Sequence, residues 1–349
     1  MAINPAFLTV LSADAETRQG LFATTARRMG TSERNVEKDF WVCLTLDILF
    51  NNLEPAGPRL LFKGGTSLSK AYGLIARFSE DIDVTVFRDD LGQPGSVEAL
   101  AALSGKQRNA RLDAIRDACR AYINGPLLEQ LIVAFGAVTG AANHWPVEII
   151  PDPEDPSGQG LQVRYASVTA ADNDYIRPVV RIESGAKSAL DPNAPRVLTP
   201  YVAADLPDTD FSIPGIVTVD SRRTFWDKVV ILHGLRRWHD IRGELRQEGQ
   251  RVSRHYYDLH RLLASDAGDA ATNLALGEDC VLHARMFFNR PDFDLASAKS
   301  GSFALVPAGD MLDRLRRDYR AMSEMIFGDA PSFDEVIASV AVLETRLNG

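Results

Sequence analysis

Two aspartates stand two residues apart in the segment Asp81-Ile82-Asp83. Polar and apolar residues alternate from position 81 to 86, which is the two-residue period of a β-strand with one buried face. Side chains at i and i+2 of a strand leave it on the same face, so the two carboxylates would project together. Carboxylate oxygens are the ligands that Mg²⁺ takes in proteins. The pair therefore predicts a metal-binding face at the start of a strand.

A glycine turn precedes this strand and follows a short apolar strand at residues 60–62. Backbone N–H groups of such a turn, at the start of a helix, can hold a phosphate. We predict that the nucleotide contacts lie in this turn: Lys63, Gly64, Gly65, Thr66 and Ser67. Thr66 or Ser67 would also cap the helix, whose apolar stripe is Leu68, Tyr72 and Ile75. Lys63 would face the phosphate or be only a solvated strand end.

Each of these features is common when it occurs alone, because many Asp-x-Asp pairs are solvated strand ends and many Gly-Gly pairs are simple turns. Their order and spacing carry the prediction: a phosphate-binding turn and a metal-binding strand within one strand–turn–helix–strand unit are the layout of a nucleotidyltransferase. Two-metal sites share several carboxylates, so a third acid is expected from a neighbouring strand. Glu183, at the end of a predicted strand over 177–183, is the candidate. The alternative is a strand-edge acid that pairs near Arg181.

Several blocks of the chain resemble one family. The blocks Lys63-Gly64-Gly65-Thr66-Ser67-Leu68 and Arg77-Phe78-Ser79-Glu80-Asp81-Ile82-Asp83 resemble the AbiEii/AbiGii toxin family of polymerase-beta-like nucleotidyltransferases, which is similar to the MenT-type toxins. Further resemblance lies in Val36-Glu37-Lys38-Asp39-Phe40-Trp41, Phe225-Trp226-Asp227-Lys228, His255-Tyr256-Tyr257-Asp258-Leu259 and the segment 318–328. The resemblance covers most of the chain, and its first two blocks are the specific ones.

The resemblance implies a catalytic set of Asp81, Asp83, Lys228 and Asp258, with Lys228 at the triphosphate and Asp258 orienting Lys228 or the acceptor. A lysine in an apolar helix otherwise extends its amine to water, and Asp258 could instead pair within its helix with Arg254 or Arg261. The resemblance also implies an NTP substrate and two Mg²⁺ ions. It implies a toxin, of the kind used in phage defence, that modifies an RNA acceptor, most simply a tRNA 3′ end, and so blocks translation. The implied partner is a winged-helix antitoxin.

Composition narrows the class of protein further. The 349 residues are 45% hydrophobic, which allows a sizeable core. We find no apolar run long enough for a bilayer and no signal peptide, and three isolated cysteines fit a reducing cytoplasm. The net charge is −9, yet residues 221–261 carry ten Lys/Arg and five Asp/Glu. This basic segment would contact RNA, or it is a solvated helix face with ordinary ion pairs.

The predicted fold is α+β. We expect a nucleotidyltransferase domain over 1–220, with a mixed sheet and flanking helices, and an all-helical C-terminal domain over 221–349. Helices are predicted over residues 14–30, 32–51 and 97–122, and again over 221–240, 254–264, 269–288, 310–327 and 332–347. The proline-rich segment 185–214 is expected to be an extended excursion or loop with room for one short strand. Two rival functions remain: nucleotidylation of a protein or small molecule, and a non-catalytic nucleotide-sensing module, which the intact aspartate pair disfavours.

Overall fold

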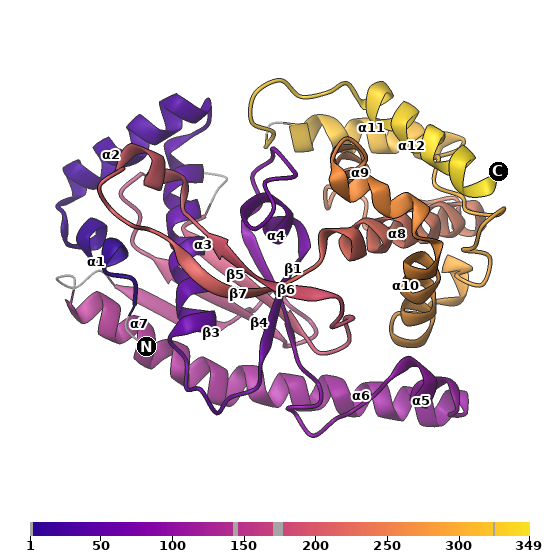
Figure 1. Ribbon diagram of the computed structural model, residues 1–349, viewed down its shortest axis with the longest axis horizontal. Helices are drawn as coiled ribbons and strands as arrows, with labels where there is room; N and C mark the ends of the chain where they lie inside the picture. The colour runs from indigo at the N-terminus through magenta and orange to yellow at the C-terminus, as the bar shows by residue number, and fades with distance from the viewer. Residues whose placement is uncertain (1–2, 142–145, 170–176, 324) are drawn as a thin grey trace. The chain divides into compact units, whose positions relative to one another are not determined.

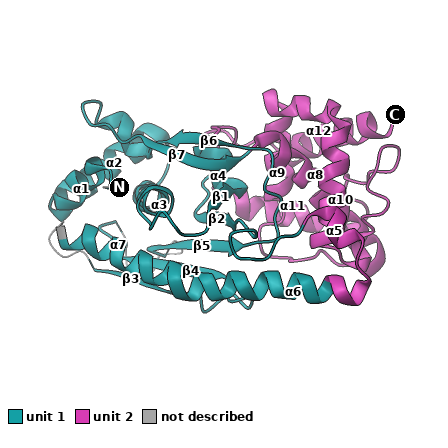
Figure 2. Ribbon diagram, turned by 60° about the horizontal axis from the view of Figure 1, so that its bottom comes forward, with its two compact units in different colours: residues 1–71, 78–95, 109–219 teal, residues 72–77, 96–108, 220–349 magenta. Residues whose placement is uncertain are grey.

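The computed structural model describes residues 3–141, 146–169, 177–323 and 325–349. The chain divides into two compact units, shown in Figure 2. Unit 1 comprises Met1–Ala71, Phe78–Gly95 and Asn109–Val219, and unit 2 comprises Tyr72–Arg77, Ser96–Arg108 and Asp220–Gly349. The helical unit therefore takes up two segments from the N-terminal part of the chain. The functional domain boundary at residue 220 stays a prediction.

Unit 1 is built on a seven-stranded mixed sheet in the order β3-β4-β5-β2-β1-β7-β6 (Figure 1). The predicted α+β class is thus confirmed. The central pairs β1–β7 and β2–β5 are parallel, and the other neighbouring pairs are antiparallel. The strands are β1 Leu60–Lys63, β2 Asp81–Val86, β3 Val147–Pro151, β4 Gly160–Tyr165, β5 Val179–Gly185, β6 Asn193–Leu198 and β7 Ile213–Val219.

Helices flank this sheet, and α3 packs against its central strands β2, β5 and β7. Ser32 caps α3, because its Oγ accepts a hydrogen bond from the Asn35 N–H. Trp41 of α3 stacks on Tyr165 of β4 with ring centroids 4.7 Å apart. The helices of unit 1 are α1 Pro5–Ser12, α2 Ala15–Met29, α3 Glu33–Asn51, α4 Gly64–Lys70, most of α6 Gly105–Tyr122, and α7 Leu128–Ala141.

The pairing of β1 with β2 confirms the strand–helix–strand unit predicted around the glycine turn. The two strands run antiparallel, with Lys63 opposite Asp83 and Phe62 opposite Val84. Ile82, Val84 and Val86 are fully buried, whereas Asp81 and Asp83 are partly exposed on the other face. The alternation of polarity along β2 therefore placed both carboxylates on the face that was expected.

Two predictions about local structure were wrong. The helix after the glycine turn ends at Lys70, so Tyr72 and Ile75 do not extend its stripe. The residues 72–77 instead belong to unit 2. The predicted helix over 97–122 is broken into α5 Val97–Ala101 and α6, and only the latter contributes mainly to unit 1. The first helix ends next to the division between the two units, whereas the break between α5 and α6 lies within unit 2 and α6 itself continues across the division.

Unit 2 is helical in its main segment. Helix α8 packs against α9 and α10, and α9 packs against α12. The indole of Trp226 on α8 donates a hydrogen bond to the Ala270 carbonyl at 2.9 Å. The α-helices after residue 220 are α8 Ser221–Arg242, α9 Arg254–Leu263, α10 Leu274–Phe287, α11 Asp310–Ser323 and α12 Phe333–Asn348.

One continuous helical stretch, 105–140, is long and apolar enough to cross a membrane by length and composition alone. The sequence analysis had found no such stretch. Core helices of soluble proteins satisfy the same criterion, so the finding is weak evidence for a membrane span. The three cysteines are free and buried, as expected for core thiols.

Candidate active site

The glycine turn lies directly against the second aspartate of the strand. Gly64 begins α4 with a φ of +78°, and a Cβ atom added there would sit 2.0 Å from Asp83 Oδ2. Only glycine accepts this backbone conformation at little cost, and only a residue without a side chain leaves room for the carboxylate. Gly64 is therefore required by the placement of Asp83, quite apart from any bound phosphate.

The hydroxyl groups of the turn point inward. Thr66 and Ser67 are fully buried. Thr66 Oγ1 donates to the Asp81 carbonyl and lies 2.9 Å from Ser79 Oγ. Ser67 Oγ donates to the Gly64 carbonyl at 2.9 Å. The prediction that one of them caps the helix is wrong, because the helix begins earlier, at Gly64. The two hydroxyls instead fix the turn to the start of β2.

The carboxylates gather where β2 meets β5. The parallel register sets Asp83 beside Glu183 and Asp81 beside Arg181, and side chains at paired positions share a face of the sheet. Burial, reinforced by the charges of Glu80 and Asp83, raises the pKa of Asp81 to about 6. Ionised Asp81 is thus electrostatically unfavourable in the protein by itself.

These residues suit Mg²⁺ in their chemistry, because all the donors are carboxylate oxygens and an added cation would relieve the repulsion that raises the pKa of Asp81. Within the described residues, no three His, Cys, Asp or Glu side chains are grouped closely enough to hold a metal ion. Glu183 is exposed and adjacent in register, so its role as a third ligand stays a prediction. Lys63 Nζ lies 3.7 Å from Asp83 Oδ1.

Helix α3 carries three consecutive buried charges that sequence reasoning had treated only as part of a resemblance. Glu37, Lys38 and Asp39 are at most 4% exposed. Lys38 pairs with Glu80, the residue before Asp81. Asp39 pairs with Lys70, at the end of α4, at 2.6 Å. Glu37 accepts hydrogen bonds from the segment 167–169 that follows β4. One turn of α3 therefore anchors three segments of unit 1.

In unit 2, the structure brings Lys228 and Asp258 together. Lys228 Nζ lies 2.7 Å from Asp258 Oδ2 and 3.2 Å from His255 Nδ1. Arg77 holds the same carboxylate with both arms of its guanidinium, Nε to Oδ1 at 2.7 Å and Nη2 to Oδ2 at 2.9 Å. The alternative pairing of Asp258 with Arg254 or Arg261 in its own helix is not present.

The chemistry open to Asp258 follows from these contacts. Burial opposes ionisation of this carboxyl, but the charges of Arg77 and Lys228 outweigh it and hold its pKa well below the usual range. With both oxygens engaged by cations, Asp258 orients Lys228 and is a poor proton acceptor. Burial and the charge on Lys228 also lower the pKa of His255 well below its ordinary value, so a neutral imidazole accepts at Nδ1.

Arg77 is a site residue that the sequence analysis missed. It stands four residues before Asp81 in the chain, and its segment is fixed in unit 2 by backbone contacts: the Phe327 N–H donates to the Ala76 carbonyl at 2.8 Å, and Arg77 forms an isolated bridge with Ile326. The available signal was the arginine that opens the Arg-Phe-Ser-Glu-Asp block. Nothing local, however, indicates that its partner lies 181 positions later.

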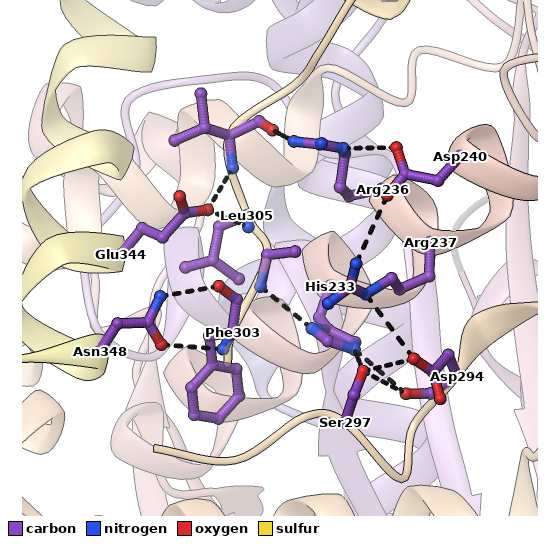
Figure 3. Close-up of polar contacts among 12 residues, drawn as sticks. His233, Arg236, Arg237, Asp240, Asp294, Ser297, Phe303, Leu305, Glu344 and Asn348 are labelled. Carbon is purple, nitrogen blue, oxygen red and sulfur yellow. Dashed lines mark hydrogen bonds and ion pairs between the residues drawn. The ribbon is translucent and has the colours of Figure 1, made fainter. Parts of the chain in front are cut away.

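The basic segment 221–261 is less available than its composition suggests. Figure 3 shows Arg236 bound to Asp240, with Nε 2.8 Å from Oδ1, and Arg237 between Asp240 and Asp294 at 3.6 and 3.8 Å. Arg242 pairs with Asp292, at 2.7 Å from its Nε. These three arginines thus form the ion pairs that the second interpretation expects, and the contact of this segment with RNA stays a prediction.

The same region holds a serine and a histidine in contact, but not as a nucleophile and base. His233 Nδ1 accepts a hydrogen bond from the Ala304 N–H at 3.1 Å, and burial lowers the His233 pKa. The proton of the neutral ring is then on Nε2, which faces the Asp294 carbonyl and Ser297 Oγ, each at 3.2 Å (Figure 3). A protonated Nε2 cannot deprotonate Ser297, so this cluster is structural.

A model of the family described as "Nucleotidyl transferase AbiEii toxin, Type IV TA system" matches residues 47–339. The match includes the glycine turn, both aspartates of β2, Lys228 and Asp258. Among solved structures, the chain is similar to MenT4, a nucleotidyltransferase toxin from Mycobacterium tuberculosis H37Rv, at 17% sequence identity. That match covers 93% of this chain and 97% of the other, with a TM-score of 0.40, too low to support an argument. No curated protein matches.

Proposed function

The chain belongs to the AbiEii nucleotidyltransferase toxin family of type IV toxin–antitoxin systems, and from this premise we propose that it transfers a nucleoside monophosphate from an NTP to an RNA acceptor. The acceptor we propose is a tRNA 3′ end, whose modification would block translation in the cytoplasm. The observation that carries the proposal is the pair Asp81 and Asp83 on β2, packed against the glycine turn that begins at Gly64.

In this proposal, Asp81 and Asp83 hold Mg²⁺, with Glu183 as the third ligand. Bound magnesium would supply charge neutralisation at the triphosphate and activation of the acceptor oxygen. The backbone of Gly64 and Gly65, with Lys63, faces the triphosphate, while Thr66 and Ser67 maintain the turn through their internal hydrogen bonds. Each of these assignments has a direct test by substitution.

Lys228 would contribute its positive charge to the triphosphate, and Asp258 would hold it in place. The hydrogen bonds of Asp258 favour this division of roles, because both carboxylate oxygens already accept from Arg77 or Lys228. Proton removal from the acceptor hydroxyl is then not a task for Asp258. Its substitution should act through the position and charge of Lys228.

A partner follows from the family. A type IV toxin–antitoxin family implies a cognate antitoxin, and we propose a winged-helix protein encoded beside the toxin. Expression of the chain alone should arrest growth, and expression with the antitoxin should restore it. The same arrest should be absent when Asp81 is replaced by asparagine.

The decisive experiment incubates the protein with total RNA, Mg²⁺ and each of the four α-phosphate-labelled NTPs in turn. We expect one RNA size class to become labelled, which would identify acceptor and donor together, and the Asp81→Asn protein is the matched negative control. Label in protein or in a small molecule would favour the alternative acceptors. NTP binding without any transfer would favour a nucleotide-sensing module and contradict the proposal.

A further inference from the structure

One side of α9 carries two exposed arginines, with the buried Asp258 between them. Arg254, Asp258 and Arg261 follow one another at i, i+4 and i+7, so they lie on one side of the helix. Asp258 is fully buried, whereas Arg254 and Arg261 are exposed. The two α-carbons are separated by about 10 Å along the helix, at 1.5 Å per residue. We refer to Arg254 and Arg261 as the α9 cationic face.

Among the exposed cations of the basic segment, these two arginines are the ones without an acidic partner among the described residues. Across the described part of the chain, neither side chain forms an ion pair or a hydrogen bond, and Asp258 between them is already held by Arg77 and Lys228. Arg246, which forms no ion pair with a described residue either, is half-buried over the rings of Trp238 and Phe293. The exposed arginines elsewhere in the segment have acids of their own: Arg222 pairs with Asp220 and Arg242 with Asp292.

The arrangement is electrostatically unfavourable without a counter-charge. Besides burial, the positive charge of Arg254 lowers the pKa of both Lys228 and His255. The charge of Arg77 acts in the same direction on both groups, and the charge of Lys228 does so on His255. Arg254 is also the first residue of α9, where the helix dipole favours an acid and disfavours a cation. Several cations around a single carboxylate, with two of them free at the surface, form a positive field that a polyanion would neutralise.

We propose that the α9 cationic face binds backbone phosphates of the acceptor RNA, beside the lysine that serves the triphosphate. This inference rests on the proposed function and specifies which surface receives the acceptor. Phosphates of the NTP share the same chemistry, but the exposure of both arginines and their separation by two helical turns favour a long polyanion. The paired cations Arg236, Arg237 and Arg242 are not part of this surface.

The test compares two double variants that each remove two exposed positive charges: Arg254→Ala/Arg261→Ala, and the control Arg222→Ala/Arg242→Ala. Binding of purified tRNA is measured against salt concentration, and NTP binding is measured separately. Each lost phosphate contact should reduce the slope of log K against log salt by roughly 0.7–0.9. We therefore expect the α9 variant to lose about 1.5 of slope and to bind RNA about tenfold more weakly or worse, with unchanged NTP affinity.

The charge-preserving variant Arg254→Lys/Arg261→Lys should keep most of the wild-type slope, which separates loss of charge from damage to the helix. Wild-type RNA affinity and slope in the α9 alanine variant, or an equal loss in the control, would overturn the inference while leaving the proposed function intact. Loss of NTP affinity alone would assign the surface to the triphosphate and likewise overturn it. Failure of the wild-type protein to bind or label RNA would remove the proposed function as well.

Discussion

Substitution of Gly64 by alanine should separate the two reasons for which a glycine stands in the turn. The left-handed conformation, with φ of +78°, costs an alanine about 1–2 kcal/mol. The new Cβ would also lie 2.0 Å from Asp83 Oδ2, so the carboxylate must move by more than an ångström from contact that ordinarily begins near 3.5 Å. Rotation of Asp83 out of its rotamer adds roughly 0.5–1.5 kcal/mol.

The matched control is Gly30→Ala in the same unit. Gly30 has a φ of +67° but nothing within 4 Å of an added Cβ, so it carries the backbone cost without the collision. Both variants should melt several degrees lower, at about 2–4 °C for each kcal/mol. Only Gly64→Ala should lose transfer activity, by about 100-fold, which is a typical loss for a catalytic group displaced by an ångström.

The assay is NMP incorporation into RNA at a temperature where both variants are folded, together with thermal unfolding of each. Equal turnover of the two variants would refute the reasoning, because it would show that transfer does not need the Asp83 carboxylate in its present position next to Gly64. If Gly64→Ala aggregates, the double variant Gly64→Ala/Asp83→Ala replaces it in the comparison. The double variant removes the collision with the carboxylate, so it should recover stability but not activity.

Four other substitutions test the remaining assignments. Asp81→Asn and Asp83→Asn should each abolish transfer, and since burial raises the pKa of Asp81 to about 6, Asp81→Asn should raise the melting temperature of the metal-free protein at neutral pH. Lys228→Ala should lower kcat by an amount equivalent to about 3–4 kcal/mol, as for other contacts to developing charge; unchanged turnover would make Lys228 a structural lysine. Asp258 has a folded pKa below its ordinary 3.8, so the stability it confers exists above that pH and is lost as pH falls below it. Asp258→Asn should therefore be less stable than the wild type at neutral pH. In an acid titration, its free energy of unfolding should not show the decrease that protonation of Asp258 causes in the wild type.

The parts of the fold that the sequence predicted are those decided locally. The alternation from Asp81 to Val86 has the period of a strand, and its buried face is the one observed. Helix α3 was predictable from its apolar stripe and from the cap at Ser32, because a capping side chain and the N–H that it binds are three residues apart. Neither inference needed knowledge of the rest of the chain.

Other features depended on distant contacts. The proline-rich segment 185–214 was expected to be an extended loop with room for one short strand, and it contains β6, with Pro195 inside it; the pairing of that strand could not be predicted. β6 is the last strand of the sheet order, and an edge strand tolerates the missing N–H of proline. The collision between Gly64 and Asp83 likewise depends on the β1–β2 register, and the partner of Arg77 is in another part of the chain. A local sequence pattern does not indicate which distant residues form such contacts.

The three consecutive charged residues of α3 are buried, and their burial explains why each of them has a partner elsewhere in unit 1. A charge taken out of water costs several kcal/mol unless it is paired, so Glu37, Lys38 and Asp39 must each have a partner placed by the fold. The partners of Lys38 and Asp39 are Glu80 and Lys70, which border the aspartate strand and the glycine helix. Lys38 thus neutralises the acid next to Asp81 and limits the repulsion within the carboxylate group. Through these ion pairs, the helix that precedes the glycine turn helps to position the two short motifs that form the proposed metal-binding face.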